Sequence, residues 1–180
     1  MVSQNSVLYR FSPDGQPEKP KELLRELLLN KQSLPIEQLV VGPKINSDGG
    51  DQFFLLSPDQ RDHYVRAISR YPGAESIFKE FSLISIDEGI GSKEGQLLTP
   101  IALAFDRQRT RLLVLEAQGS LKVFDARPDV EHRYITQWGQ VGRADGAFLV
   151  SVPVGVSMVV DVQGMIYVAD GSGRIQVFTP

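Results

Sequence analysis

The chain has 180 residues, enough for one ordinary domain with a sizeable core. Hydrophobic residues make up 42% and charged residues 23%, which excludes a disordered or fibrous chain. The net charge of −3 predicts no broad attraction to nucleic acid or anionic lipid, and the lack of cysteine excludes disulfides, thiolate zinc sites and thiol nucleophiles.

No targeting or membrane segment is predicted. The opening residues, 1–6, lack a basic segment followed by an apolar core, and nowhere do eighteen apolar residues run together. We therefore expect a cytoplasmic protein that does not insert into a membrane.

The first elements expected are a strand and a helix. Val7–Phe11 predicts a strand, and Pro13–Gly15 has the chemistry of a turn. Pro20–Asn30 predicts an amphipathic helix, since Pro is tolerated in the first turn of a helix. Its apolar stripe consists of Leu23, Leu24, Leu27 and Leu28. This stripe is expected to pack on a sheet or to cap an open end of the fold, and the alternative is docking into a partner protein.

Residues 36–88 allow two interpretations. Four apolar runs predict the strands Ile36–Val41, Phe53–Leu56, Tyr64–Ile68 and Phe81–Ile86. Residues 46–50 predict a hairpin turn between the first two of these runs. Arg61–Tyr71 and Ala74–Phe81 also fit helical spacing, so short helices remain the alternative there.

From Gly89 onward the strand pattern is regular. Strands are predicted at 100–106, 111–116, 121–125, 132–138, 153–161, 165–170 and 174–178. The landmarks of these segments recur at offsets of 51 to 54 residues, because Gly95, Pro100, Glu116 and Phe124 match Gly146, Pro153, Asp170 and Phe178. A period of this size is typical of repeat proteins in which each repeat forms one small sheet.

The later repeat resembles an NHL repeat. Its landmarks run in the usual order from Trp138 through Gly146, Pro153, Asp170 and Arg174 to Phe178. The copy over 89–124 resembles the family less closely, since Ala102 replaces the usual Gly and Glu116 the usual Asp. The resemblance covers residues 89–178 and implies a β-propeller with one four-stranded blade per repeat.

Together with the strand pattern, the resemblance leads us to expect a single propeller-like domain. Residues 1–35 are expected to form an N-terminal strand and helix, 36–88 a degenerate blade, 89–138 a blade, and 139–180 a blade without its fourth strand. Propellers need about four to eight blades to close, so about three blades leave two open ends. Three arrangements would cover them. In the first, Val7–Phe11 pairs beside Ile175–Phe178 and the resulting three-bladed arc dimerises into a six-bladed ring. In the second the helix caps one end, and in the third other subunits complete the ring.

The sequence holds few residues that point to catalysis. Asp106 and Asp161, together with Glu116 and Asp170, end apolar runs and are candidates for carboxylates near a propeller axis. Carboxylates at such positions also accept hydrogen bonds in turns, which is the expected role here. Asp170 and Arg174 are expected to pair across a hairpin. His63 and His132 alone do not form a three-His zinc site.

We therefore expect no metal or cofactor, and a non-enzymatic module that binds other proteins or copies of itself. The first alternative is an enzyme, lyase-like or lactonase-like, acting on a small ligand through axial carboxylates. The second is an RNA-binding module, with Trp138, Phe148 and Tyr167 stacking on bases, although the basic residues are interleaved with acidic ones.

Overall fold

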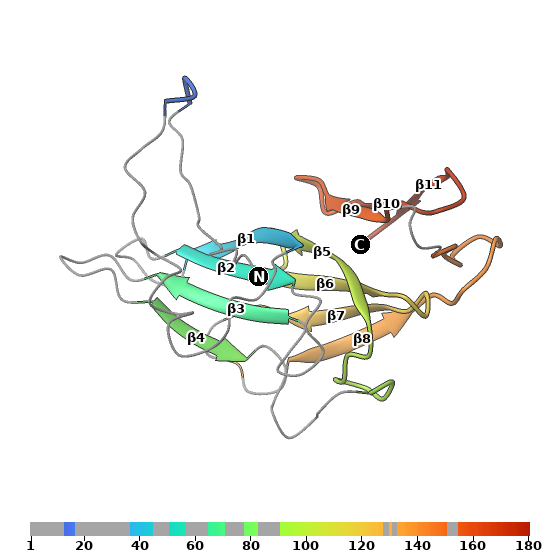
Figure 1. Ribbon diagram of the computed structural model, residues 1–180, viewed down its shortest axis with the longest axis horizontal. Coiled ribbons are helices and arrows are strands. Elements are labelled where there is room, and N and C mark those ends of the chain that lie inside the picture. Colours follow the sequence, from blue (N-terminus) through green and yellow to red (C-terminus); the bar gives the residue numbers. More distant parts are fainter. Residues whose placement is uncertain are drawn as a thin grey trace, which may run out of the picture.

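The computed structural model describes residues 13–16, 37–44, 51–56, 65–70, 78–82, 91–127, 130, 133–150 and 155–180. In this part of the chain, eleven strands form three antiparallel sheets, as Figure 1 shows. The prediction of a mainly β protein is confirmed. Among the same residues, no helix is long and apolar enough to cross a membrane.

The first sheet contains β1 (Gln38–Lys44), β2 (Asp51–Leu56), β3 (Val65–Arg70) and β4 (Phe78–Ser82), in chain order. The helical alternative is therefore wrong for the described residues 65–70 and 78–81. The predicted strand Phe81–Ile86 starts too late, because β4 begins at Phe78, opposite Arg70. This earlier start supplies partners for the backbone groups on the outer edge of β3, the edge that faces away from β2.

The second sheet contains β5 (Pro100–Asp106), β6 (Arg111–Glu116), β7 (Leu121–Asp125) and β8 (Tyr134–Trp138). The first three have the predicted boundaries, whereas β8 begins at Tyr134, later than the predicted 132, and ends at Trp138 as predicted. Nearly every residue of β5, β6 and β7 is buried. Strands are buried on both sides in this way when their sheet is packed between two other layers.

The third sheet contains β9 (Ser157–Val160), β10 (Ile166–Ala169) and β11 (Ile175–Phe178), in the order β11-β10-β9. Burial alternates along these strands, with Met158, Ile166 and Val168 buried and their neighbours more exposed. This alternation is typical of a sheet with one packed face and one open face.

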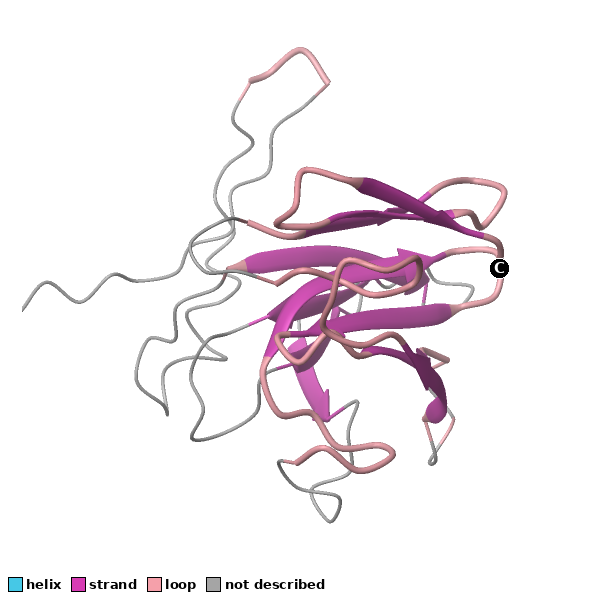
Figure 2. Cartoon of the chain, turned by 90° about the vertical axis from the view of Figure 1, so that its right-hand side faces the viewer, coloured by secondary structure: helices cyan, strands magenta, loops and turns pink. Residues whose placement is uncertain are grey.

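The sheets stack on one another, and the second lies in the middle (Figures 1 and 2). One apolar cluster joins the first and second sheets, and another joins the second and third. The initial strands lie side by side, since β5 contacts both β1 and β9. The Gln38 side chain strengthens this contact, because it donates to Leu103 O over 2.8 Å and accepts from Leu103 N over 2.6 Å.

Several predicted features lie outside the described residues: Val7–Phe11, the helix with Leu23, Leu24, Leu27 and Leu28, the turn at 46–50, Pro153, His63 and His132. The predicted turn at 13–15 is described, with Gly15 at a φ of 80°.

Candidate functional site

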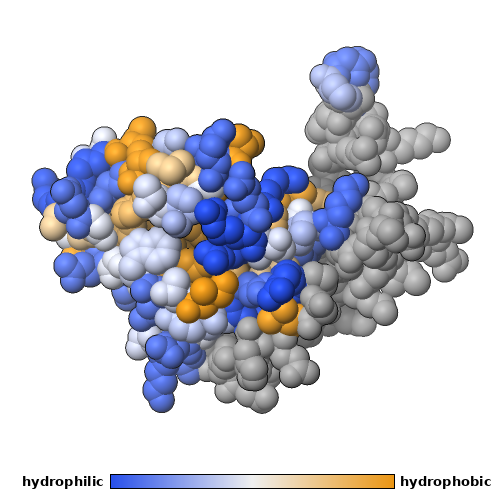
Figure 3. Space-filling view, turned by 180° about the vertical axis from the view of Figure 1, so that it is seen from behind, coloured by the Kyte–Doolittle hydropathy of each residue, from blue (hydrophilic) through white to orange (hydrophobic). Residues whose placement is uncertain are grey.

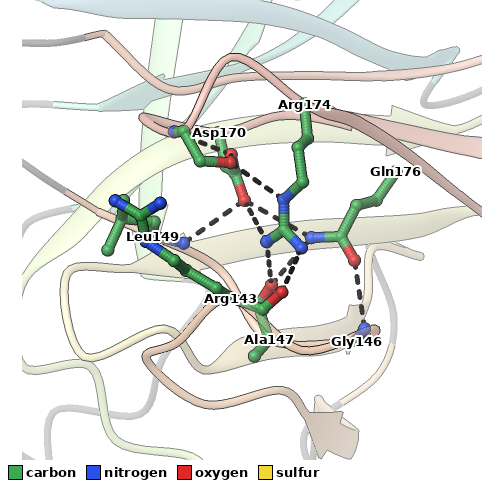
Figure 4. Close-up of polar contacts among 8 residues, drawn as sticks. Arg143, Gly146, Ala147, Leu149, Asp170, Arg174 and Gln176 are labelled. Atoms are coloured by element: carbon green, nitrogen blue, oxygen red, sulfur yellow. Dashed lines mark hydrogen bonds and ion pairs between the residues drawn. The ribbon is translucent and has the colours of Figure 1, made fainter.

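The best-connected polar cluster of the third sheet is built around Asp170. Its side chain is fully buried at the end of β10, and Arg174 Nη2 lies 2.8 Å from Asp170 Oδ2. Leu149 N and Ser172 N also donate to this carboxylate, over 3.3 and 2.9 Å. The predicted pair of Asp170 and Arg174 across the hairpin is thus present (Figure 4).

This cluster binds the loop that precedes the third sheet. Arg174 donates to the carbonyl oxygens of Arg143 and, over 3.1 Å, Ala147. Gln176 Nε2 donates to the same Ala147 oxygen over 2.7 Å, while Gly146 N donates to Gln176 Oε1 over 3.0 Å. Figure 4 shows the Arg174 and Gln176 side chains converging on this loop. The cluster therefore attaches residues 143–149 to the sheet.

The electrostatics of Asp170 follow from these contacts. Burial by itself raises the pKa of a carboxylate, but the hydrogen bonds from Ser172, Arg174 and Leu149 outweigh burial and hold the pKa of Asp170 well below its ordinary value of 3.8. Asp170 is therefore ionised at neutral pH and serves as a fixed anion for the loop and the arginine.

The second sheet contains the same device built from different residues. Glu116 Oε1 accepts from Leu98 N over 2.6 Å, and Glu116 Oε2 lies 3.0 Å from Lys122 Nζ. Lys122 also donates to Gln96 O over 2.5 Å and to Lys93 O over 3.3 Å. A carboxylate at the end of the second strand and a nearby cation thus hold the preceding loop in both sheets.

The backbone repeats as well. Gly91 N donates to Leu97 O and Gly142 N to Phe148 O, each over 3.2 Å and at an offset of 51 residues. The β6–β7 turn has a bond from Gly119 N to Glu116 O, and the β10–β11 turn has one from Gly173 N to Asp170 O. The repeat found in the sequence is therefore a repeat of conformation.

Of the two proposed axial carboxylates, Asp106 is the last residue of β5 and Asp161 directly follows β9. Asp106 Oδ1 accepts from Gln108 N over 3.0 Å, and Oδ2 lies 3.4 Å from Arg109 Nη1. Asp161 Oδ1 accepts from Gln163 N over 2.8 Å, and Oδ2 accepts from the Tyr167 hydroxyl over 3.0 Å. Each carboxylate thus bonds within its own hairpin.

The turn also sets the pKa of Asp161. Its partial burial tends to raise that pKa, but hydrogen bonds from Met165 N, the Tyr167 hydroxyl and Gln163 N together bring it below the ordinary value. The hydrogen bond to Asp161 in turn raises the pKa of Tyr167. No group of three His, Cys, Asp or Glu residues suited to a metal ion occurs in the described segments.

The aromatic landmarks Trp138 and Phe178 meet between the second and third sheets. Their ring centroids lie 6.3 Å apart, and Phe178 also lies 5.6 Å from Phe148. Both Trp138 and Phe178 pack against the cluster that joins these sheets. In these positions the rings contribute to packing between neighbouring sheets.

One apolar face of the third sheet is not covered by any other described residue segment. We call the face of each sheet toward the preceding sheet its front face, and the opposite face its back face. On the back face of the second sheet, two cross-strand rows are covered by the third sheet and are less than 5% exposed. These rows are Ala102–Leu115–Leu121 and Ala104–Leu113–Val123.

The matching rows of the third sheet are Ser157–Ala169–Ile175 and Val159–Tyr167–Val177. Here Val159 is 58%, Ile175 70% and Val177 51% exposed. In the space-filling view from behind, hydrophobic residues are exposed at the top of the molecule, in the region of this sheet (Figure 3). The third sheet thus carries a back face of the same design as that of the second sheet, with nothing packed on it among the described residues.

Two further contacts show the same difference. Within the described residues, β8 pairs with β7, while β11 pairs with β10 alone and has an open outer edge. Gly119, with a φ of 74°, lies under the backbone of Gln140 and Val141, which leads to the third sheet. The matching Gly173, with a φ of 80°, has no neighbour that an added Cβ would meet within 4 Å.

Sequence reasoning missed three features of this region. It treated Lys122 as one of many interleaved basic residues, although the side chain is fully buried beside Glu116. The signal was its place in the repeat, which is equivalent to that of Gln176. Both residues lie six positions after the carboxylate of their repeat. The bonds of Gln38 to Leu103 and the contrast between the two back faces have no local signal, because both depend on how the sheets stack.

Comparison with models of known protein families gives no match, and comparison with curated proteins gives none either.

Proposed function

We propose that this protein is a non-enzymatic interaction module: a propeller of the NHL type with too few blades to close, completed by self-association or by subunits of a larger assembly. The observation that carries this proposal is the open back face of the third sheet, defined by its two exposed cross-strand rows.

The propeller interpretation is supported by the arrangement of the sheets. Three antiparallel meanders stack face to face, their initial strands β1, β5 and β9 lie next to one another, and two carry the same carboxylate-and-cation device. Propellers repeat such meanders around an axis and usually contain about four to eight. The three meanders of the described residues form a stack with a free face at each end.

The open face has the chemistry of a protein-binding surface. Val159, Ile175 and Val177 are aliphatic, lie on the two strands that flank β10 and are more than half exposed. Burying the exposed part of each side chain is worth on the order of 1 kcal/mol. The outer edge of β11, to which no other described strand is bonded, adds backbone groups that a further strand can bond. Surfaces of this kind are ordinarily covered in a stable assembly.

Solvent access to the open face tests this function, and the lack of native cysteine makes the measurement clean. A single cysteine replaces Val177 on the back face, or Val162 as the matched control. Val162 is 76% exposed and lies in the β9–β10 turn, away from the two rows. Each variant is labelled with a maleimide, first in intact cells that express it and then as purified protein.

We expect the cysteine at 177 to be labelled at least tenfold more slowly than the cysteine at 162 in cells, because a bound protein covers the sheet. Equal labelling rates at the two positions in cells would contradict the proposed function. Slow labelling at 177 in cells but fast labelling in the purified protein would identify a partner other than the chain itself.

A further inference from the structure

We propose that the occupant of the open back face is the first sheet of a second copy of this chain, so that two copies form a closed two-fold ring of six sheets. The proposal rests on the proposed function and names the partner.

The stacking within one chain has a direction. The front face of the second sheet, which includes Leu103, Phe105 and Leu112, packs on the back face of the first. The front face of the third sheet, which includes Met158, Ile166 and Val168, packs on the back face of the second. Each contact thus joins one front face to one back face, and the open back face of the third sheet requires a front face.

The described residues contain one front face that is not seated on another sheet, that of β1 and β2. It carries Leu39 opposite Leu55 and Val41 opposite Phe53. All four are apolar, as are Leu103, Phe105 and Leu112 on the front face of the second sheet and Met158, Ile166 and Val168 on that of the third. Leu55 is buried, Leu39 and Phe53 are partly exposed, and Val41 is 44% exposed. The described residues therefore present a front face at one end of the stack and a matching back face at the other.

A front-to-back contact between copies is heterologous, so it produces either a closed ring or an open fibre. Propellers close with about four to eight sheets. One copy supplies three sheets, two copies supply six and three copies supply nine, so two copies give the closed solution. In that ring both open back faces are covered by the same contact.

The register within the chain predicts which residues meet between copies. Gln38 of β1 bonds to the backbone of Leu103 of β5. In the cross-strand pairing, Gln38 lies opposite Leu56, as Ala102 lies opposite Leu115 and Ser157 opposite Ala169. Gln38, Ala102 and Ser157 are thus equivalent positions in the three sheets, and Leu103 is equivalent to Leu39. If the contact between copies repeats the contact of Gln38 with Leu103, Ser157 of one copy lies beside Leu39 of the other.

Cross-linking between differently tagged, co-expressed copies tests this contact. One copy carries Leu39→Cys and the other Ser157→Cys, and a short bis-maleimide joins cysteines that lie close together. We expect a product of two chains that carries both tags. Leu39→Cys alone, Ser157→Cys alone, and Leu39→Cys paired with Val162→Cys are the controls, and each should give less than a tenth of that product.

Sedimentation of the unlabelled protein gives the second readout. Each chain has a mass of 20.0 kDa, so the expected species has twice that mass. Val177→Lys should convert it to a folded monomer with unchanged circular dichroism, because Val177 is exposed within one chain.

A wild-type monomer at micromolar concentration, or a tagged pair that does not cross-link, would overturn the second copy as the occupant. If the cysteine at 177 is still protected in cells, the interaction function stands and the occupant is a different protein. If that cysteine is freely labelled in cells, the function itself fails.

Discussion

Lys122 Nζ lies 3.0 Å from Glu116 Oε2, and both side chains are almost completely removed from water. The ammonium group also satisfies two carbonyl oxygens of the loop before β5, those of Lys93 and Gln96. Removing the cation alone leaves a buried carboxylate without its counter-charge. Removing both charges leaves only apolar and neutral groups at this buried position.

Lys122→Met should therefore lower the free energy of unfolding by about 3 to 5 kcal/mol. The double variant Glu116→Gln/Lys122→Met should lose clearly less than this single variant. Urea unfolding measures the stability of both variants. The control is Lys93→Met, which replaces an exposed lysine of the same loop and should change stability by about 0.5 kcal/mol or less. Equal losses in the single and double variants would show that the ion pair is not the reason for the effect.

Asp170 makes stability depend on pH. Its pKa is lowered in the folded protein from the ordinary 3.8, so its contribution is fully present above that value and is lost as the pH falls below it. Asp170→Asn should lower the free energy of unfolding at pH 7 by about 2 kcal/mol, because it weakens hydrogen bonds to a charged group.

The difference between wild type and Asp170→Asn should stay constant from pH 7 to about pH 5 and shrink below about pH 4. Urea midpoints at four or five pH values check this. Asp145→Asn, at an exposed aspartate of the attached loop, removes the same charge and should cost about 0.5 kcal/mol or less at pH 7. A wild-type advantage that grows on acidification would have the wrong sign for a lowered pKa.

Gln38 should control how tightly β1 and β5 are joined. Gln38→Leu removes the donor and the acceptor that Leu103 uses, and an unsatisfied backbone group costs about 1 to 3 kcal/mol. We expect the amide hydrogen of Leu103 to exchange at least tenfold faster with deuterium, as measured by NMR. Gln38→Glu keeps an acceptor for Leu103 N–H and should show a smaller acceleration. If Leu103 exchanges at the same rate in all three proteins, the side-chain bonds do not hold these strands together.

Gly119 and Gly173 offer a matched comparison of a covered turn with an uncovered one. Both have a positive φ, so alanine costs about 1 kcal/mol in either turn from backbone strain alone. At Gly119 the added Cβ would also collide with backbone atoms of Gln140 and Val141, which have little freedom to move.

Gly119→Ala should therefore reduce the thermal midpoint by several degrees more than Gly173→Ala. Differential scanning calorimetry on the two variants provides the comparison. The reverse order would mean that the chain leading to the third sheet does not pass over the β6–β7 turn.

Local patterns were sufficient to locate most strands. The boundaries of β5, β6 and β7 follow from apolar runs ended by Asp, Glu and turn residues. The pair of Asp170 and Arg174 was also predictable, since a tight hairpin brings residues four positions apart together. The start of β4 was not predictable, because the apolar pattern fits a start at Phe78 as well as one at Phe81. Only the pairing of Phe78 with Arg70 makes Phe78 part of the strand.

What the sequence determined by itself is the series of short strands, turns and repeated landmarks, because alternation and turn chemistry act over a few residues. Only the tertiary structure decided which faces are covered. Val123 and Val177 occupy the same place in matching strands, yet one is 4% and the other 51% exposed. The physical reason is that burial of a sheet face depends on whether another sheet lies against it, and residues far away in the chain supply that sheet.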